Sequence, residues 1–324
     1  MRLPRRRFLH LAAGTVALPA VTRFAWAQSY PSRPVRIIVG TAAGGAADIH
    51  ARLFGQWLSE RLGQSFIVEN RPGAGNNIGT ELVVRAPADG YTLLMVQTAN
   101  AINATLYDKL NFNFIRDIAP VASMIRVANV MEVHPSFPAK SVAELIAYAR
   151  ANPGKINMAG PTGSLIHMAG ELFKTMTGVN MVHVPYRGEV PALTDLLGGQ
   201  VQVYFGTLPG SIEHIKAGRL RAVAMTTESR SVLLPDVPTI GEFVPGYEAS
   251  GWQGIGAPKN TPAEIIAKLN REINAALADP QIKARLADLG STALAGSPAS
   301  FGKLIADETE KWGKVVKTAG IKAD

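Results

Sequence analysis

The chain has 324 residues, 47% of them hydrophobic, and carries 33 Lys+Arg against 25 Asp+Glu with no cysteine. The lack of cysteine excludes a disulfide framework, a thiolate nucleophile and a cysteine-based metal site. Five arginines lie in the first 27 residues, which contain no acid, so the rest of the chain has 28 basic against 25 acidic residues, a net charge of only +3. No basic stripe remains that would favour a nucleic-acid partner.

The first 27 residues have the pattern of an export signal. Three arginines, Arg5 to Arg7, precede Phe8 and an apolar run over 9–21, and the small-residue pattern of 25–27 follows. This is typical of a twin-arginine signal peptide cleaved after Ala27, and it predicts a periplasmic mature protein. The alternative is a basic amphipathic anchor or an uncleaved membrane helix, but the apolar run is shorter than the roughly twenty residues that span a bilayer.

Short β-branched runs then alternate with amphipathic segments. The run 35–39 ends at a glycine, as a buried parallel strand does, and 49–62 repeats apolar residues at helical spacing. Strands are also predicted at 66–68, 92–96, 155–158, 181–184 and 201–205, and helices at 78–85, from 141 to 151, at 165–176 and at 190–197. This alternation predicts an α/β fold with mostly parallel sheets flanked by helices.

Two long apolar stretches predict that the chain crosses between two lobes. The stretch 121–133 contains no turn residue and is too long for one buried strand, so we expect it to leave one lobe and enter the other, with 249–257 as the returning strand. Helices are expected from Thr261 onward. Domain 1 is therefore predicted to comprise 28–127 and 250–324, and domain 2 to comprise 128–249. A cleft between two domains is a usual place for a small-molecule site.

The mature chain resembles the solute-binding proteins of the tripartite tricarboxylate transporter family, also called Bug proteins. The likeness runs over essentially all of it and rests on ordered motifs. They are YPSRP at 30–34, VENRPGAG at 68–75, ADGYTL at 88–93, HVPYRG at 183–188, LLGGQV at 196–201, LPDVPT at 234–239 and PGYE at 245–248, followed by Trp252. The resemblance implies a type II-like, two-lobed periplasmic binding fold of the Venus flytrap kind. Such a protein closes on a small carboxylate or dicarboxylate and passes it to a two-component membrane permease.

Two glycine loops are the candidate carboxylate site. Residues 40–48 join the first strand to the first helix and carry only small side chains before Asp48, so backbone N–H groups at a helix N-terminus are exposed to an anion. Asp48 is expected in the first helical turn, either as a structural cap or in contact with the ligand. A second loop, 160–164, precedes the helix containing His167. Ligand contacts to both lobes would favour the closed form.

The predicted ligand-binding residues come from these loops and from neighbouring strand ends. By resemblance, Thr41, Gly44, Gly45, Gly163 and Ser164 hold one carboxylate of the solute. The full predicted set is Thr41, Ala42, Ala43, Gly44, Gly45, Ala46, Asp48, Thr98, Thr162, Gly163, Ser164, His167, Tyr186, Gly206 and Thr207. No catalytic residue, cofactor or metal site is predicted, because no two histidines have metal-ligand spacing. Arg187 is either a partner for a distal carboxylate or a solvated surface residue.

Several positions depart from the family pattern. The chain has Gly40, Thr41, Ala43 and Ala47 where members usually have proline, an aromatic residue, proline and threonine, and Pro161 where glycine is frequent. Gly206-Thr207 stands where the family often has Asp-Asn. We expect these changes to enlarge the pocket and remove polar groups, which favours a bulkier, more apolar or aromatic acid.

Other functions are weighed against binding. An exported enzyme is disfavoured because the chain has no Gly-x-Ser-x-Gly elbow and no cysteine nucleophile. The Gly73-Ala74-Gly75 loop matches a dinucleotide fingerprint only loosely. A periplasmic sensor that docks to a kinase uses the same closing motion as a transport protein, and the sequence leaves this alternative open. A monomer is expected.

Overall fold

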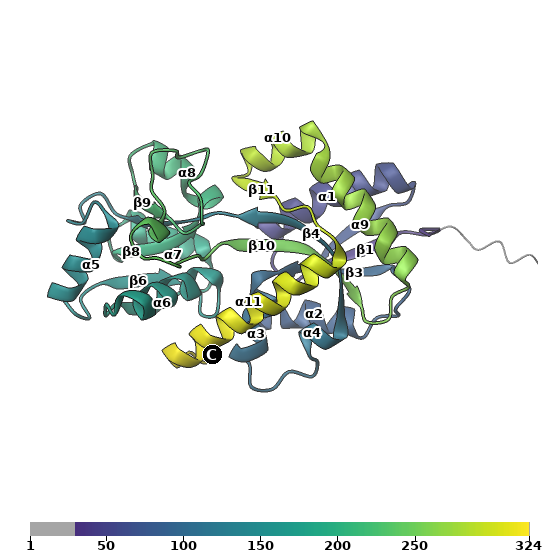
Figure 1. Ribbon diagram of the computed structural model, residues 1–324, viewed down its shortest axis with the longest axis horizontal. Helices are drawn as coiled ribbons and strands as arrows, with labels where there is room; N and C mark the ends of the chain where they lie inside the picture. Colours follow the sequence, from purple (N-terminus) through teal and green to yellow (C-terminus); the bar gives the residue numbers. More distant parts are fainter. Residues whose placement is uncertain (1–29, 324) are drawn as a thin grey trace, which may run out of the picture.

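The structure is a computed structural model that describes residues 30–323, so the predicted signal peptide lies outside the described residues. Figure 1 shows two α/β lobes side by side, with strands β4 and β10 running between them and helix α11 lying across both. Each lobe is built on one sheet flanked by helices, which confirms the predicted fold class. Among the described residues, no helix is both long enough and apolar enough to cross a membrane.

The sheet of the first lobe has six strands in the order β11-β4-β10-β3-β1-β2. Strands β1, β2 and β3 are parallel to one another, and β10 runs antiparallel to both β3 and β4. The strands are β1 (Val35–Val39), β2 (Phe66–Asn70), β3 (Thr92–Gln97), β4 (Ile118–Val127), β10 (Gly251–Pro258) and β11 (Ser291–Ala293).

The sheet of the second lobe has five strands in the order β7-β6-β8-β5-β9. Strands β6, β7 and β8 are parallel, and β5 runs antiparallel to its two neighbours, β8 and β9. The strands are β5 (Asn129–Val133), β6 (Asn157–Gly160), β7 (Val182–Pro185), β8 (Val203–Thr207) and β9 (Arg221–Met225).

The long apolar stretch expected to form one crossing strand is divided into two. Strand β4 ends at Val127 and β5 begins at Asn129, so Ala128 alone separates a strand of one sheet from a strand of the other. The division follows from hydrogen bonding, because each half must pair within its own sheet. The return crossing enters β10 at Gly251. The carboxyl ends of the parallel strands in each sheet consequently point toward the junction of the lobes.

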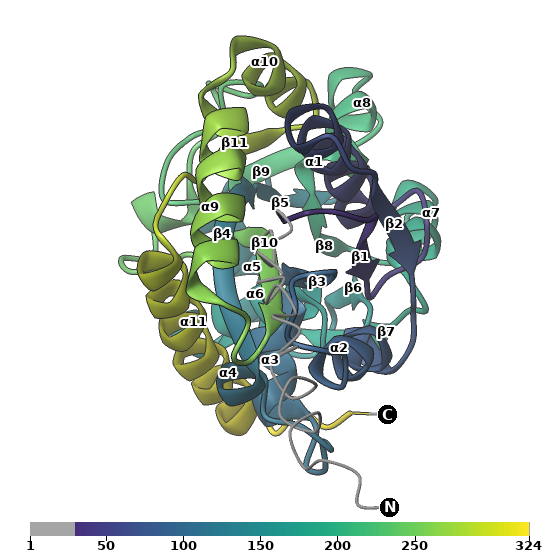
Figure 2. The same ribbon diagram turned by 90° about the vertical axis from the view of Figure 1, so that its right-hand side faces the viewer.

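Helices cover both faces of each sheet, as alternating burial requires. In β1, Val35, Ile37 and Val39 pack in one core with α1 and α9, whereas Ile38 packs in another with α2 and α11. The first lobe contains α1 (Ala46–Leu62), η1 (Ala74–Asn76), α2 (Asn77–Val84), α3 (Thr98–Leu106), α4 (Phe114–Asp117), α9 (Ala263–Ala278) and α10 (Pro280–Asp288). Figure 2 looks onto this lobe, with α1 and α9 near its upper part.

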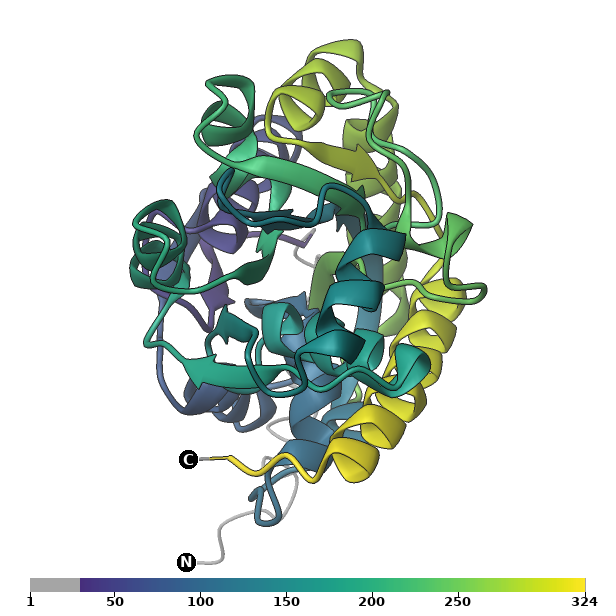
Figure 3. The same ribbon diagram turned by 90° about the vertical axis from the view of Figure 1, so that its left-hand side faces the viewer.

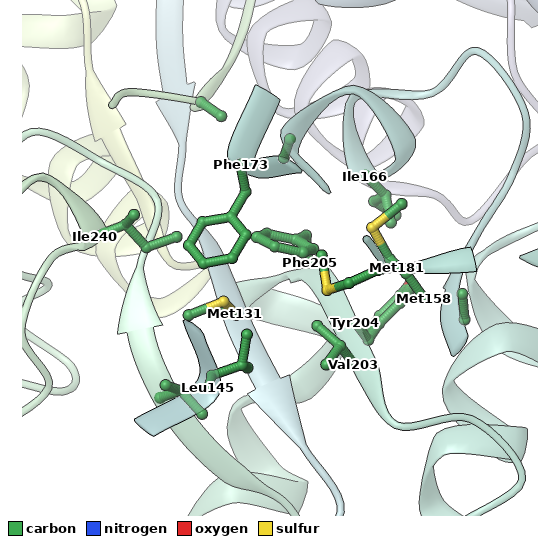
Figure 4. Packing of buried hydrophobic residues seen from close by; sticks show 14 of the residues in the cluster. Met131, Leu145, Met158, Ile166, Phe173, Met181, Val203, Tyr204, Phe205 and Ile240 are labelled. Carbon is green, nitrogen blue, oxygen red and sulfur yellow. The ribbon is translucent and has the colours of Figure 1, made fainter. Parts of the chain in front are cut away.

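The core of the second lobe is rich in aromatic side chains and methionine. Figure 4 shows Phe173 of α6 beside Phe205 of β8, with Met131 and Met158 around them. The two phenyl rings lie 6.0 Å apart at 51°, within the usual range for tilted aromatic pairs. The helices of this lobe are α5 (Val142–Ala151), α6 (Leu165–Thr177), α7 (Glu189–Leu197), α8 (Leu208–Lys216) and η2 (Ile240–Glu242).

The last helix, α11 (Pro298–Ala319), belongs to both lobes. Its first half packs Phe301 against Trp252 in the first lobe, with ring centroids 5.8 Å apart. Its second half buries Trp312 and Val316 in the core of the second lobe, against α6. Figure 3, in which the second lobe faces the viewer, shows the yellow helix running along the edge of that lobe. The predicted domain division assigned this whole helix to the first lobe.

Candidate ligand-binding site

The two sheets present their parallel strand ends to the same junction. In the first lobe, β1, β2 and β3 are followed by the N-termini of α1, of η1 with α2, and of α3. In the second lobe, β6, β7 and β8 lead into the N-termini of α6, α7 and α8. In α/β sheets, ligands bind at the carboxyl ends of parallel strands, and helix N-termini there favour anions. The junction is therefore the candidate site.

The loop after β1 is open to solvent. Residues Ala42 to Gly45 are exposed, and Gly44 has a φ of 82° with no atom within 4 Å of the place where a Cβ would stand. The N–H groups of Gly45 and Ala46 donate to no acceptor in the described part of the chain. These amides remain available to an anion at the start of α1.

Asp48 has a structural role in this loop. Its side chain is buried, and its Oδ2 accepts the N–H of Gly44 at 2.9 Å. Arg52, one turn further along α1, donates to both carboxylate oxygens, at 2.9 and 3.1 Å. Burial acts to raise the pKa of Asp48, but the bonds from Arg52 and Gly44 outweigh it and hold the pKa below its usual value. Both carboxylate oxygens of Asp48 therefore have partners within the loop and the first turns of α1.

Three buried polar atoms line the edge of the first sheet without a partner among residues 30–323. They are Thr41 Oγ1, after β1, Asn77 Nδ2, at the start of α2, and Gln97 Nε2, at the end of β3. Buried polar groups are nearly always hydrogen-bonded, so three exceptions that follow three neighbouring parallel strands indicate a place for a ligand. Two of them are amide donors, which suits a carboxylate. Asn77 and Gln97 are not among the residues predicted from the sequence, although Gln97 ends a parallel strand and Asn77 begins the helix that follows one.

Thr98 is engaged within the first lobe. Its Oγ1 accepts the N–H of Trp252 at 2.9 Å, which ties the start of α3 to the returning strand β10. Trp252 is itself buried and donates from Nε1 to Glu308 of α11 at 3.1 Å. Both residues therefore connect the crossing strand to its neighbours.

The loop after β6 touches the other lobe. Gly163 has a φ of 73°, and a Cβ at this position would lie 2.3 Å from Leu106 Cδ2 at the end of α3. Only glycine fits this left-handed position and this close approach. Ser164 caps α6 by accepting the N–H of His167 at 3.3 Å, and its hydroxyl donates to the carbonyl of Pro161 at 2.7 Å. The neighbouring Thr162 is only partly buried.

His167 lies inside the second lobe. Its ring stacks on that of His183, with centroids 3.6 Å apart, and its Nε2 lies 3.6 Å from a carboxylate oxygen of Glu171. Its Nδ1 accepts the N–H of Gly163 at 3.3 Å. Lys174 donates to Glu171 at 2.7 Å. This network supports the loop from behind, and His167 is 4% exposed.

Tyr186 and Thr207 lie at the ends of β7 and β8. The hydroxyl of Tyr186 donates to Asp195 Oδ2 of α7 at 2.6 Å, and burial together with this carboxylate raises the pKa of Tyr186 to about 12. Thr207 donates to Glu189 Oε2 at 2.9 Å. Arg187 is exposed.

The surroundings of Gly206 differ from the enlarged and less polar pocket that was expected there. A Cβ at Gly206 would lie 2.6 Å from Glu132 Oε1 and 2.4 Å from the ring of Tyr204. The missing side chain therefore does not leave an empty, less polar pocket, because a carboxylate from the adjacent strand β5 occupies the space. Glu132 is not among the residues predicted from the sequence, although an acid in an otherwise apolar strand is unusual enough to be noticed there.

A separate cavity of about 280 Å³ lies at the opposite edge of the hinge. Its walls include Arg126, Ala128 and Ser250 at the crossings, Ser229 and Arg230 after β9, and Thr292 of β11. It contains none of the predicted ligand-binding residues. Among residues 30–323, no group of three or more histidine or acidic side chains is placed to hold a metal ion.

The match to a family model covers most of the chain. The model of the tripartite tricarboxylate transporter family receptor, TctC, matches residues 50–321. The chain belongs to this family. Its similarity to BugT of Bordetella pertussis (strain Tohama I) agrees, at 38% identity over 300 residues, which cover 91% of this chain and 92% of BugT. TctC proteins are receptors, which confirms the prediction of a binding protein over an enzyme.

Solved structures of proteins that are 30–40% identical to this chain have the same fold. R. palustris Rpa4515 with adipate matches at a TM-score of 0.82 and 40% identity, covering 90% of this chain and 99% of that one. MatC from Rhodopseudomonas palustris with bound malate matches at a TM-score of 0.78 and 30% identity, covering 89% of this chain and 100% of that one.

Proposed function

We propose that this TctC-family receptor captures a small carboxylate between its lobes, in the periplasm, and delivers it to a two-component membrane permease. The observation that carries the proposal is the row of unpartnered polar atoms of Thr41, Asn77 and Gln97 beside the exposed amides at the start of α1. The two structural relatives named above are described with adipate and malate, which are both dicarboxylates.

The proposed ligand contacts come from both lobes. Asp48, Thr98 and His167 are not among the proposed contacts, because their side chains already have hydrogen-bond partners within the protein. They hold the loops and helix starts of the site in place. The proposed contacts are Thr41, Ala42, Ala43, Gly44, Gly45, Ala46, Asn77 and Gln97 from the first lobe, and Thr162, Gly163, Ser164, Tyr186, Gly206 and Thr207 from the second. Only part of this set is expected to touch any one solute.

Three further parts of the proposal concern the whole chain. Export occurs by the twin-arginine route with cleavage after Ala27, and the mature protein acts as a monomer. The lobes that close are 28–127 with 250–324, and 128–249, and the second half of α11 packs against the second of them. The strand break at Ala128 and the entry to β10 at Gly251 support these boundaries, since each sheet's strands fall on one side of them.

A thermal-shift screen of mono-, di- and aromatic carboxylates tests the function. A ligand at a hundred times its Kd stabilises the native state by about 2.7 kcal/mol, which is a clear shift in Tm. Calorimetry on the best acid then compares the parent with Gln97→Ala. Removing a hydrogen bond to a charged group costs about 1.5–3 kcal/mol, so affinity should fall at least tenfold.

The matched control is Gln56→Ala, which removes an exposed glutamine from the outer surface of α1. It should bind the acid as the parent does. Equal affinity of all three proteins would contradict the assignment of the edge atoms, and the absence of any carboxylate ligand would contradict the function. Delivery is tested by measuring uptake of the labelled acid into vesicles that hold the permease, with and without the receptor.

A further inference from the structure

Large apolar side chains are exposed at the starts of three helices that begin at the junction of the lobes. Ile49 of α1 is 38% exposed, Ile78 of α2 is 53% exposed and Val190 of α7 is 77% exposed. Each of these helices follows a parallel strand whose carboxyl end points toward the junction. Apolar surface is therefore present at this junction on both lobes, beside the backbone amides that are available to an anion. Exposed apolar surface of this kind commonly belongs to a ligand-binding groove.

A cavity of about 120 Å³ lies beside Val190 in the second lobe. It is bounded by the starts of α7 and α8 and by the end of β8, and most of the atoms that line it are carbon. Its walls include Val190, Leu193, Tyr204, Thr207, Gly210 and Ser211. Small-molecule pockets are typically apolar, with a few polar groups that fix the orientation of the ligand. An apolar cavity on the order of 150 Å³ can hold a benzene molecule, so this one has room for a short alkyl chain.

The polar side chains around the cavity already have partners within the protein. The hydroxyl of Ser211 donates to Glu132 Oε1, and the hydroxyl of Thr207 donates to Glu189 Oε2 at 2.9 Å. The hydroxyl of Tyr204 is buried and out of reach of solvent. The hydroxyl protons of Ser211 and Thr207 are thus not available to a polar group of a solute.

Glu189 makes this place unfavourable for a second carboxylate. It also lines the cavity, and it is the first residue of α7, bonded to Thr207, the N-cap of α8. Negative charge is favoured at helix N-termini, and here the protein itself supplies it. A carboxylate of the solute that entered the cavity would meet the like charge of Glu189, whereas an alkyl group would contact Val190 and Leu193.

The position of the cavity sets the length of the solute. Strand β8 pairs with β6, which leads into the 160–164 loop at the start of α6. Adjacent strands are about 5 Å apart, so a carboxylate at that loop and an alkyl group in the cavity are separated by several carbon–carbon bonds. Acids as short as acetate cannot reach both places.

We propose that the solute is a monocarboxylate with an apolar tail, whose carboxylate binds at the glycine loops while its tail enters the cavity between the starts of α7 and α8. This inference rests on the proposed function and adds the substrate class. It also gives the apolar acid expected from the sequence a place other than the space beside Gly206, which Glu132 fills.

Calorimetry on the mature protein with matched acids tests the inference. Propanoate, butanoate, pentanoate and hexanoate are compared with succinate, glutarate and adipate. Each methylene that leaves water should raise the affinity about fourfold until the cavity is full. Hexanoate should bind at least tenfold more tightly than adipate, which has the same length and a second charge.

Two variants test the place of the tail. Gly210→Leu adds a side chain at the cavity wall, since a Cβ there lies 3.1 Å from Thr207 Oγ1 and 3.8 Å from Glu189 Oε2. It should lower the affinity for hexanoate at least tenfold and leave that for propanoate unchanged. Val190→Ser removes an exposed apolar side chain and should lower the affinity for hexanoate at least threefold. The matched control is Val232→Ser, because Val232 is 83% exposed and lines the other cavity, at the hinge.

The outcomes separate this inference from the proposed function. Binding of adipate as tightly as hexanoate, or an unchanged affinity for hexanoate in both Gly210→Leu and Val190→Ser, would overturn the inference and leave carboxylate capture standing. An equal loss of affinity for hexanoate in Val232→Ser would also overturn it, because the effect would not depend on the cavity. Failure of every acid to bind would overturn the proposed function itself.

Discussion

Replacing Glu132 by glutamine should change how the stability of the ligand-free protein depends on pH. The carboxyl group has an ordinary pKa of 4.5 when the chain is unfolded and a pKa of about 8 when it is buried in the folded protein. Between these values the folded state holds a proton that the unfolded state has lost. The free energy of unfolding of the parent therefore falls as the pH rises through this range, by up to about 1.4 kcal/mol per pH unit.

Over the whole interval the effect amounts to about 5 kcal/mol. Glutamine does not titrate, so Glu132→Gln lacks this dependence, and it should gain stability over the parent by about that amount between pH 4.5 and pH 8. Above pH 8 and below pH 4.5 the difference between the two proteins should stay constant, because the folded and unfolded carboxyl groups then carry the same charge.

Urea unfolding of both proteins at pH 5, 6, 7 and 8 measures the effect, in buffers free of carboxylates so that no ligand is supplied. Glu213→Gln is the matched control, since it removes an exposed acid from the same lobe. If the gap between parent and Glu132→Gln were the same at pH 5 and pH 8, the carboxyl group would be solvated or paired. The reasoning from burial would then be refuted.

Three more outcomes are expected. Gly163→Val should lower carboxylate affinity at least tenfold in calorimetry, because its side chain would overlap Leu106 across the lobes and valine is strained at a φ of 73°. Wild-type affinity of the variant would contradict this reasoning. Asp48→Asn should reduce the free energy of unfolding by about 1–2 kcal/mol at pH 7, because the partner of Asp48, Arg52, is half-exposed. The ionised carboxylate stabilises the fold above pH 3.8, and this contribution is lost as the pH falls through the lowered pKa of Asp48. A loss of stability in the variant that is as large at pH 2.5 as at pH 7 would contradict an ionic cause. Trp312→Ala should cost about 3–5 kcal/mol in urea unfolding, and a cost below 1 kcal/mol would contradict its place in the core of the second lobe.

The α/β alternation and the two glycine loops could be predicted because their signals are local. A β-branched run that ends in glycine, followed by residues at helical spacing, identifies a strand, a loop and a helix without any knowledge of the rest of the chain. The loops of 40–45 and 160–164 were found in this way, and both precede helix N-termini in the structure.

Helix α3 was not predicted, since its sequence, TANAINATL, has no apolar stripe and is rich in asparagine. Its asparagines are satisfied by distant groups. Asn100 donates to the hydroxyl of Thr80 at 2.8 Å, and Asn103 donates to Oδ1 of Asn77 at 3.1 Å. Tertiary hydrogen bonds of this kind override a weak local propensity, and they cannot be read from a window of sequence.

The site could be predicted only in part for the same reason. Glu132 of β5 fills the space next to Gly206 of β8. This arrangement depends on the pairing of Glu132 with Tyr204, two residues that are far apart in the chain. Likewise, Thr41, Asn77 and Gln97 belong to one edge of the first lobe because β1, β2 and β3, which they follow or end, are neighbours in the sheet. Spacing along the chain gives no information about which strands become adjacent.

The path of α11 restricts how the two halves of this receptor can move. The two strand crossings alone would allow one lobe to rotate against the other about several axes. Helix α11 adds a third connection away from the strands, because Phe301 is buried near one end of it and Trp312 near the other. Because Phe301 and Trp312 are buried in different cores, a movement of one half against the other strains the packing of the helix in one of them. The helix therefore limits the range of orientations that the two halves can take.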